Sequence, residues 1–322
     1  MRTWLHAELC GRGLEPSGEF EWVSERPWAL VLRVSTPQGF MYFKASGPGG
    51  CHEPGLVTAL AQRWSDRVPA PLAIEQRCGW MLLRDYGHTL RQALGGADGL
   101  EVWQHLLPLY AEMQIASHFE ITRWLALGVP DRRLAALPAL FGELLANEAA
   151  LCLGHSNGLR VEERAAIRAL LPEFEACCHE LAAMPYPAAL DHGDLHAGNI
   201  LTGDGAYWFF DWGDANLTHP FCSLLLVCHL LVADFARSDG QRRLARLRDA
   251  YLEPWSAHLP ASSLKPLFAA ALWVAHVGRA LDWNHMLTGT GEAARMEWQP
   301  QVARWLRSWL QRRELVMAMH RL

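Results

Sequence analysis

Two aspartates and an asparagine lie at short, fixed spacings between Leu190 and Asp214. Asn199 follows Asp194 by five residues, and Asp211 follows Asn199 by twelve. Carboxylate and amide oxygens suit Mg²⁺, which needs few protein ligands when nucleotide phosphates supply the others. An aspartate beside a hydroxyl group can orient that group and take its proton. Together these residue types and spacings predict kinase-type phosphoryl transfer.

A predicted β-hairpin joins the two halves of this stretch. A short apolar run at residues 200–201, a Gly203–Gly205 turn and a β-prone run over Ala206–Phe210 carry that prediction. The hairpin is expected to fold Asp211 back towards the other two polar residues, so that all three face one small volume. The alternative is a buried strand pair whose polar ends meet by chance.

The segment His192-Gly193-Asp194-Leu195-His196, followed by Asn199 and Asp211-Trp212, resembles the aminoglycoside phosphotransferase and choline kinase-like family. The resemblance implies a protein-kinase-like fold and a small-molecule kinase. Such an enzyme transfers the γ-phosphoryl group of a nucleoside triphosphate to a hydroxyl of a small metabolite or an aminoglycoside-like acceptor. It also implies Asp194 as the catalytic residue, Asn199 and Asp211 as Mg²⁺ ligands, and ATP or GTP as the donor.

The periodicity of the chain predicts two lobes. Strands are expected over residues 19–24, 30–35, 40–45, 70–76 and 79–83, with one helix over 52–64. The remainder is mostly helical in period, over residues 89–94, 101–118, 135–152, 161–183, 220–235, 241–255, 264–281 and 299–320. We therefore expect an α+β fold with a small antiparallel-sheet nucleotide-binding lobe, residues 1–84, and a large helical lobe, residues 85–322. The helical lobe would carry the catalytic loop, residues 190–214, and the acceptor site.

Lysine is rare in this chain, which has 29 Lys and Arg residues but only Lys44 and Lys265 as lysines. Lys44 ends the third predicted strand, where the resembling family has the lysine that grips the α and β phosphates. The alternative is an exposed lysine at a strand end. Glu53, at the start of the next helix, is the expected partner of Lys44. Otherwise Glu53 is a carboxylate favoured there by the helix dipole.

The nucleotide contacts depart from the protein-kinase pattern in one place. Kinases lay a Gly-rich loop over the phosphates, whereas the predicted turn Ser24–Trp28 contains no glycine. We expect the backbone around Ser24 to meet phosphate and the hinge backbone at Leu83 to meet the base. The choice between ATP and GTP stays open at this point.

The loop around Asp194 departs from the family as well. Many relatives carry an aspartate about a dozen residues after the metal-binding one, where it buttresses the catalytic loop, and this chain has Ser223 there. Serine brings no charge, so the loop is expected to be held differently or less well. His192 is expected to orient the loop, and His196 to be structural.

Composition excludes several classes of protein. Hydrophobic residues make up 51% of the 322-residue chain, and its net charge of −5 gives no electrostatic footprint for nucleic acid. The eight cysteines form no C-x-x-C pair, which indicates reduced thiols in a cytoplasmic protein. The N-terminus has no signal-peptide pattern, and the longest apolar run, residues 221–233, is too short to cross a membrane. The expected partners are a nucleoside triphosphate and a small hydroxylated acceptor, whose identity and the oligomeric state stay open.

Two other functions compete with the kinase interpretation. Gly154–Gly158 matches the G-x-S-x-G nucleophile elbow of a serine hydrolase, with Ser156 as nucleophile. That motif needs a preceding strand, and the preceding residues have a helical pattern, so we interpret it as a turn between helices. The second alternative is a catalytically weak, kinase-like nucleotide-binding or scaffold protein.

Overall fold

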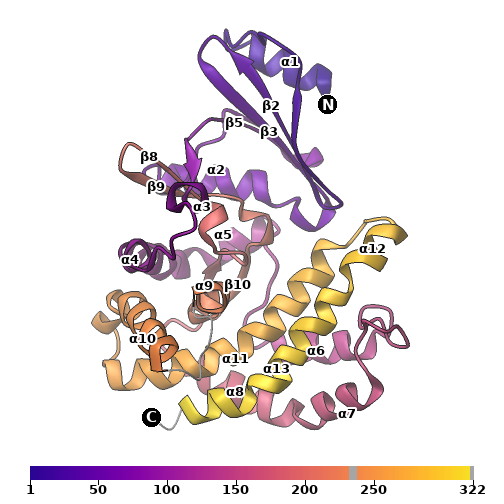
Figure 1. Cartoon of the computed structure of the whole chain (residues 1–322), viewed down its shortest axis with the longest axis vertical. Coiled ribbons are helices and arrows are strands. Elements are labelled where there is room, and N and C mark those ends of the chain that lie inside the picture. The colour runs from indigo at the N-terminus through magenta and orange to yellow at the C-terminus, as the bar shows by residue number, and fades with distance from the viewer. Residues whose placement is uncertain (232–237, 320–322) are drawn as a thin grey trace. The chain divides into compact units, whose positions relative to one another are not determined.

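The computed structural model describes residues 1–231 and 238–319 and divides into two compact units (Figure 1). Unit 1 comprises residues 1–95, 197–214 and 286–295, and unit 2 comprises residues 96–196, 215–285 and 296–322. The α+β class, with a small antiparallel sheet and a larger helical part, is confirmed. The functional boundary expected at residue 84 stays a prediction.

Unit 1 is built on a five-stranded antiparallel sheet with the strand order β1-β2-β3-β5-β4. Each of these strands overlaps a predicted one, because alternating side chains and turn residues mark them in the sequence. The strands and the main helix of this unit are β1 (Glu21–Arg26), β2 (Ala29–Thr36), β3 (Gly39–Ser46), α2 (Glu53–Arg63), β4 (Ala73–Glu75) and β5 (Trp80–Arg84).

The helix α1 (Arg2–Cys10) was not predicted. Its fully buried Leu5 and Leu9 belong to the same hydrophobic cluster as Leu32, Phe43 and other side chains of the sheet. Figure 1 shows α1 beside the sheet at the start of the chain. A helix of nine residues with no side-chain cap depends on this packing for its stability, so local sequence gives a weak signal for it.

A second sheet in unit 1 contains the predicted hairpin, in the strand order β6-β8-β9. Its strands are β6 (His88–Thr89), β8 (Ile200–Gly203) and β9 (Ala206–Phe209), with α3 (Leu90–Leu94) following β6. Asp204 and Gly205 form the turn with φ values of 50° and 78°, the backbone that a two-residue hairpin loop favours. After the hairpin, the N–H of Phe210 donates to the carbonyl of Asn199 at 3.2 Å. The predicted return of the chain to Asn199 is therefore confirmed.

Unit 2 is mostly helical. Its main elements are α4 (Leu100–Ser117), α5 (Ile121–Ala126), α6 (Leu137–Ala146), α7 (Val161–Ala169), α8 (Leu171–Ala182), β7 (Ala189–Asp191), β10 (Asn216–Thr218), α9 (Leu224–Leu231), α10 (Ser238–Leu252) and α11 (Ala261–Met286). The helices α12 (Glu292–Trp298) and α13 (Pro300–Met319) end the described chain. Trp273 of α11 and Trp309 of α13 are fully buried and stack at 4.8 Å between ring centroids, so they form part of the core.

Several predictions for this unit were wrong in detail. The helix expected over residues 161–183 is two helices, which meet at Leu170 because Pro172 begins a new first turn. The helix expected over 135–152 ends at Ala146, and turns follow. The short strands β7 and β10, which pair antiparallel, were missed. The predictions over 220–235 and 299–320 reach residues outside the described ranges.

Within the described residues, no helix combines the length and the apolarity needed to cross a membrane.

Candidate active site

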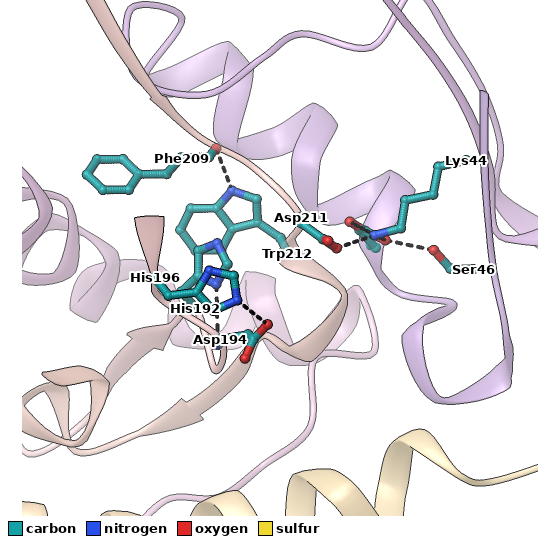
Figure 2. A network of polar contacts seen from close by, with 9 residues as sticks. Lys44, Ser46, His192, Asp194, His196, Phe209, Asp211 and Trp212 are labelled. Carbon is teal, nitrogen blue, oxygen red and sulfur yellow. Dashed lines mark hydrogen bonds and ion pairs between the residues drawn. The ribbon is translucent and has the colours of Figure 1, made fainter. Parts of the chain in front are cut away.

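Lys44, Glu53 and Asp211 meet in unit 1, and Figure 2 labels Lys44 and Asp211. The ammonium of Lys44 donates to Glu53 at 2.6 Å and to Asp211 Oδ1 at 2.5 Å. The hydroxyl of Ser46 donates to the other Glu53 oxygen at 2.7 Å. Strand β3 supplies Lys44, the start of α2 supplies Glu53, and the end of the hairpin supplies Asp211. The expected Lys44–Glu53 pair is thus present, although Glu53 lies in the first turn of its helix.

Burial and neighbouring charges shift the pKa of Lys44 in opposite directions. Glu53 is fully buried and Lys44 is 9% exposed. A charged group this far from water is stable only beside a group of opposite charge. Burial acts to lower the pKa of Lys44, but the carboxylates of Asp211 and Glu53 outweigh it and raise that pKa above its ordinary value. Lys44 is therefore a permanent positive charge at neutral pH.

The backbone around Asp211 is shaped to fit the cluster. Asp211 has φ of 65°, the left-handed region that non-glycine residues rarely adopt. A Cβ atom on Gly213 would lie 3.3 Å from a Glu53 oxygen and 3.5 Å from the Lys44 ammonium. Glycine at 213 therefore lets the chain pass directly beside the ion pair.

A pocket of about 320 Å³ lies in unit 1 beside this cluster. Its volume falls within the range of small-molecule sites. Ser24 and Leu83, both expected to face nucleotide, line it, and so do Lys44 and Asp211. Other lining residues are mostly apolar or aromatic and include Val31, Tyr42, Met81, Tyr86, Leu201 and Phe210.

The expected phosphate loop needs correction. Ser24 lies within strand β1, and only Pro27 and Trp28 connect β1 to β2. The carbonyl of Trp28 accepts a hydrogen bond from the Gly47 N–H at 2.7 Å, so the turn is fixed to the segment after β3. A two-residue hairpin leaves no loop of free amides comparable to a Gly-rich loop.

Asn199 and Asp211 carry the oxygen atoms that are expected to bind a cation. Asp211 keeps 46% of its side chain exposed, and its Oδ1 already accepts a cationic group in the form of the Lys44 ammonium. Carboxylate and amide oxygens are hard donors that suit Mg²⁺. Among residues 1–231 and 238–319, no three His, Cys, Asp or Glu side chains gather as a self-sufficient metal site. The donor set therefore fits an ion that takes its remaining ligands from phosphate and water.

Asp194 lies in unit 2, in the loop after β7. Arg279 of α11 donates to Asp194 Oδ1 at 2.7 Å and to the carbonyl of Gly193 at 3.0 Å. His196 Nε2 lies 3.4 Å from the other Asp194 oxygen, and the Asp194 N–H donates to His192 Nδ1 at 3.4 Å. His192 therefore contacts the loop as expected, whereas His196 faces the carboxylate directly. Both histidines are labelled beside Asp194 in Figure 2.

The charge of Arg279 controls the ionisation of Asp194. Burial acts to raise the pKa of Asp194, but Arg279, with His196 and His192, outweighs it and holds that pKa below its ordinary value. Asp194 is thus ionised at neutral pH, with a carboxylate fixed in direction by the guanidinium.

Sequence reasoning missed two residues that contact this loop, Arg279 and Asp191. Both had a usable signal, because each is a charged residue within an apolar run, where a charge needs a partner. Arg279 interrupts the apolar α11, and Asp191 ends the buried strand β7.

The hydrolase alternative is not supported by the structure. Ser156 lies in exposed turns between α6 and α7, with no strand before it. The strained strand-to-helix turn that a nucleophile elbow needs is absent from this part of the described chain.

A family model for the phosphotransferase enzyme family matches residues 56–262, which is more than half of the chain. A 3-deoxy-D-manno-octulosonic acid kinase from Xanthomonas axonopodis pv. citri (strain 306) is 30% identical over 214 residues, covering 60% of this chain and 83% of that protein.

Solved structures share the fold at low sequence identity. A type I macrolide 2'-phosphotransferase matches with a TM-score of 0.62 at 13% identity, covering 94% of this chain and 96% of that one. An ethanolamine kinase from Plasmodium vivax matches with a TM-score of 0.61 at 14% identity, covering 95% and 85%. Identities this low show the kinase-like fold alone. The family model and the 30% identical relative carry the assignment: this chain belongs to the phosphotransferase enzyme family and is a small-molecule kinase.

Proposed function

We propose that the pocket of unit 1 binds a nucleoside triphosphate and that Asp194 directs an acceptor hydroxyl at its γ-phosphate. The observation that carries this proposal is the Lys44–Glu53–Asp211 cluster beside a pocket of about 320 Å³. A fixed cation next to an exposed carboxylate suits the phosphates of a metal-bound nucleotide.

Each residue has one role in the proposed reaction. Lys44 neutralises phosphate oxygens, and Glu53 holds Lys44 in place. Asn199 and Asp211 would hold Mg²⁺, which when bound supplies positive charge to the β and γ phosphates. Ser24 and Leu83 line the walls of the nucleotide pocket. Four residues of the chain separate Asp194 from Asn199.

The bonds change in a simple displacement. The acceptor oxygen forms a bond to the γ-phosphorus while the bond from that phosphorus to the β–γ bridging oxygen breaks, and the nucleoside diphosphate leaves. The hydroxyl proton passes to the carboxylate of Asp194. Because Arg279 keeps the pKa of this carboxylate low, its main contribution is to orient the hydroxyl, with proton transfer late in the reaction.

A sugar acid is the first acceptor to test. The 30% identical relative is named as a kinase of 3-deoxy-D-manno-octulosonic acid. The guanidinium of Arg279 beside Asp194 also disfavours a strongly cationic acceptor such as an aminoglycoside. Ethanolamine and a macrolide, named in the structural relatives, complete the panel.

The test combines nucleotide binding with turnover. Thermal shifts with ATP and GTP, with and without Mg²⁺, are measured on the wild type, Asp211→Asn and Asp194→Asn, followed by diphosphate release with each acceptor. We expect Asp211→Asn to lose the magnesium-dependent shift. Asp194→Asn should keep that shift and lose at least about 100-fold in transfer. Full transfer by either variant would refute the assigned roles.

A further inference from the structure

The two peptide N–H groups directly before Asp194 are both held by buried side chains. The N–H of His192 donates to the Tyr110 hydroxyl at 2.9 Å, and the N–H of Gly193 donates to Asp191 Oδ1 at 3.0 Å. Gly193 has φ of 74°, a conformation that needs such fixing. The approach of the chain to Asp194 therefore depends on Tyr110 and Asp191.

Ser223 joins these two anchors. Its hydroxyl accepts from the Tyr110 hydroxyl at 3.2 Å and donates to Asp191 Oδ1 at 2.6 Å. The side-chain amide of Gln114 also donates to the Ser223 oxygen, at 2.8 Å. All four side chains are buried. The bonds run from His192 through Tyr110 and Ser223 to Asp191, and Gly193 closes the ring.

Asp191 sets the direction of every bond in this ring. The same Asp191 oxygen accepts from the Gly193 N–H and from the Ser223 hydroxyl, so the Ser223 proton points to Asp191 and the Ser223 oxygen accepts from Tyr110. In that order the Tyr110 oxygen accepts from the His192 N–H. Without the carboxylate, the hydroxyls could rotate and the peptide N–H groups would lose a fixed acceptor.

We propose that Asp191 and Ser223 act as a positioning pair that aims Asp194, an inference that rests on the proposed function. The carboxyl group that accepts from the Gly193 N–H lies at the end of strand β7, one hydrogen bond away from Ser223. The pair touches neither substrate nor the reacting atoms and acts through the backbone of His192 and Gly193. The support that an aspartate at position 223 would give to the catalytic loop is therefore supplied by Asp191 together with Ser223.

An exchange of the two side chains tests this proposal. Asp191→Ser removes the carboxylate, and adding Ser223→Asp returns one carboxylate and one hydroxyl to the same ring. Ser223→Asp alone would crowd two carboxylates into a dry site. Cys222→Ala is the matched control, because Cys222 is equally buried on the adjacent position and its thiol faces a carbonyl of α11 instead.

The readout is magnesium-dependent ATP hydrolysis with water as acceptor, measured as kcat and as KM for ATP. We expect Asp191→Ser to lower kcat by roughly 10- to 100-fold through misplacement of Asp194. The KM for ATP should not change, because the nucleotide pocket is lined by unit 1 alone. The double variant Asp191→Ser, Ser223→Asp should have a kcat at least about tenfold higher than Asp191→Ser. Such a recovery shows that the two positions are coupled, because substitutions at independent sites have additive effects. If the double variant does not recover kcat, whether because its turnover stays low or because it fails to fold, the proposed positioning pair is refuted.

A second measurement separates this inference from the proposed function. Hydrogen exchange of the peptide spanning residues 189–196 needs no activity. Ser223→Ala should speed exchange of the His192 and Gly193 amides, and Cys222→Ala should not. If the wild type neither binds nor hydrolyses ATP, the proposed function is refuted, but the exchange comparison still tests whether Ser223 and Asp191 hold the backbone before Asp194. Unchanged exchange of the His192 and Gly193 amides in Ser223→Ala would refute that role.

Discussion

Replacement of Arg279 by glutamine should move the pH dependence of phosphoryl transfer. Arg279 donates to Asp194 Oδ1 at 2.7 Å, which puts the two charge centres about 4 Å apart and gives an attraction of about 4 kcal/mol at an effective dielectric constant of about 20. Asp194 keeps 26% of its side chain exposed, so water screens part of this. We expect loss of this attraction in Arg279→Gln to raise the pKa of Asp194 by about one to three pH units, which corresponds to roughly 1.4 to 4 kcal/mol.

The sign follows from the causes acting on Asp194. Its pKa in the folded protein is lowered, so the ionised, active form persists at pH values well below neutral. In Arg279→Gln the main remaining influence is burial, which raises the pKa. The acid limb of the kcat/KM profile should therefore move upwards by about one to three pH units, towards the ordinary aspartate range.

The assay is a pH–rate profile of transfer beside a ¹³C NMR titration of the Asp194 carboxyl. His192 and His196 are kept in both proteins, so Arg279 is the one side chain that differs in the comparison. Arg307→Gln is the matched control, because Arg307 pairs with Glu163 at 3.1 Å elsewhere in unit 2. An acid limb that stays in place in a folded Arg279→Gln protein would refute the reasoning.

Two further outcomes are expected. Glu53→Gln should weaken binding of magnesium-ATP by roughly 10- to 100-fold, because loss of the charge in a charged hydrogen bond costs about 1.5 to 3 kcal/mol and leaves Asp211 as the carboxylate that pairs with Lys44. Titration calorimetry measures this, and an unchanged Kd would contradict it. Leu5→Ala in α1 should lower the free energy of unfolding by about 2 to 5 kcal/mol in urea, since Leu5 is fully buried. A loss well under 1 kcal/mol would mean that α1 contributes little to the core.

Features encoded by neighbouring residues were predictable. The hairpin that carries Asp211 was found because its turn residues and alternation lie within ten positions. The Lys44–Glu53 pair was found because one strand end and the next helix start are nine residues apart. In both cases the local chain supplies the geometry.

Features that depend on distant contacts were not predictable in this way. Arg279 reaches Asp194 across 85 residues, and Gln114 reaches Ser223 across 109. Helix α1 was missed because its stability comes from the sheet it packs against. A single sequence contains the charged or apolar residue in each case but not the identity of its partner.

The three-part composition of unit 1 has a consequence for how the protein is made. Residues 1–95 leave the ribosome before Leu201, Phe210 and Asp211, which complete the pocket wall and are synthesised about a hundred residues later. The third stretch, residues 286–295, is synthesised later still. Domains usually fold in order from the N-terminus, whereas here the first strands emerge long before their pocket can close. A nascent chain halted before residue 211 would therefore carry Lys44 and Glu53 without the carboxylate that completes their cluster.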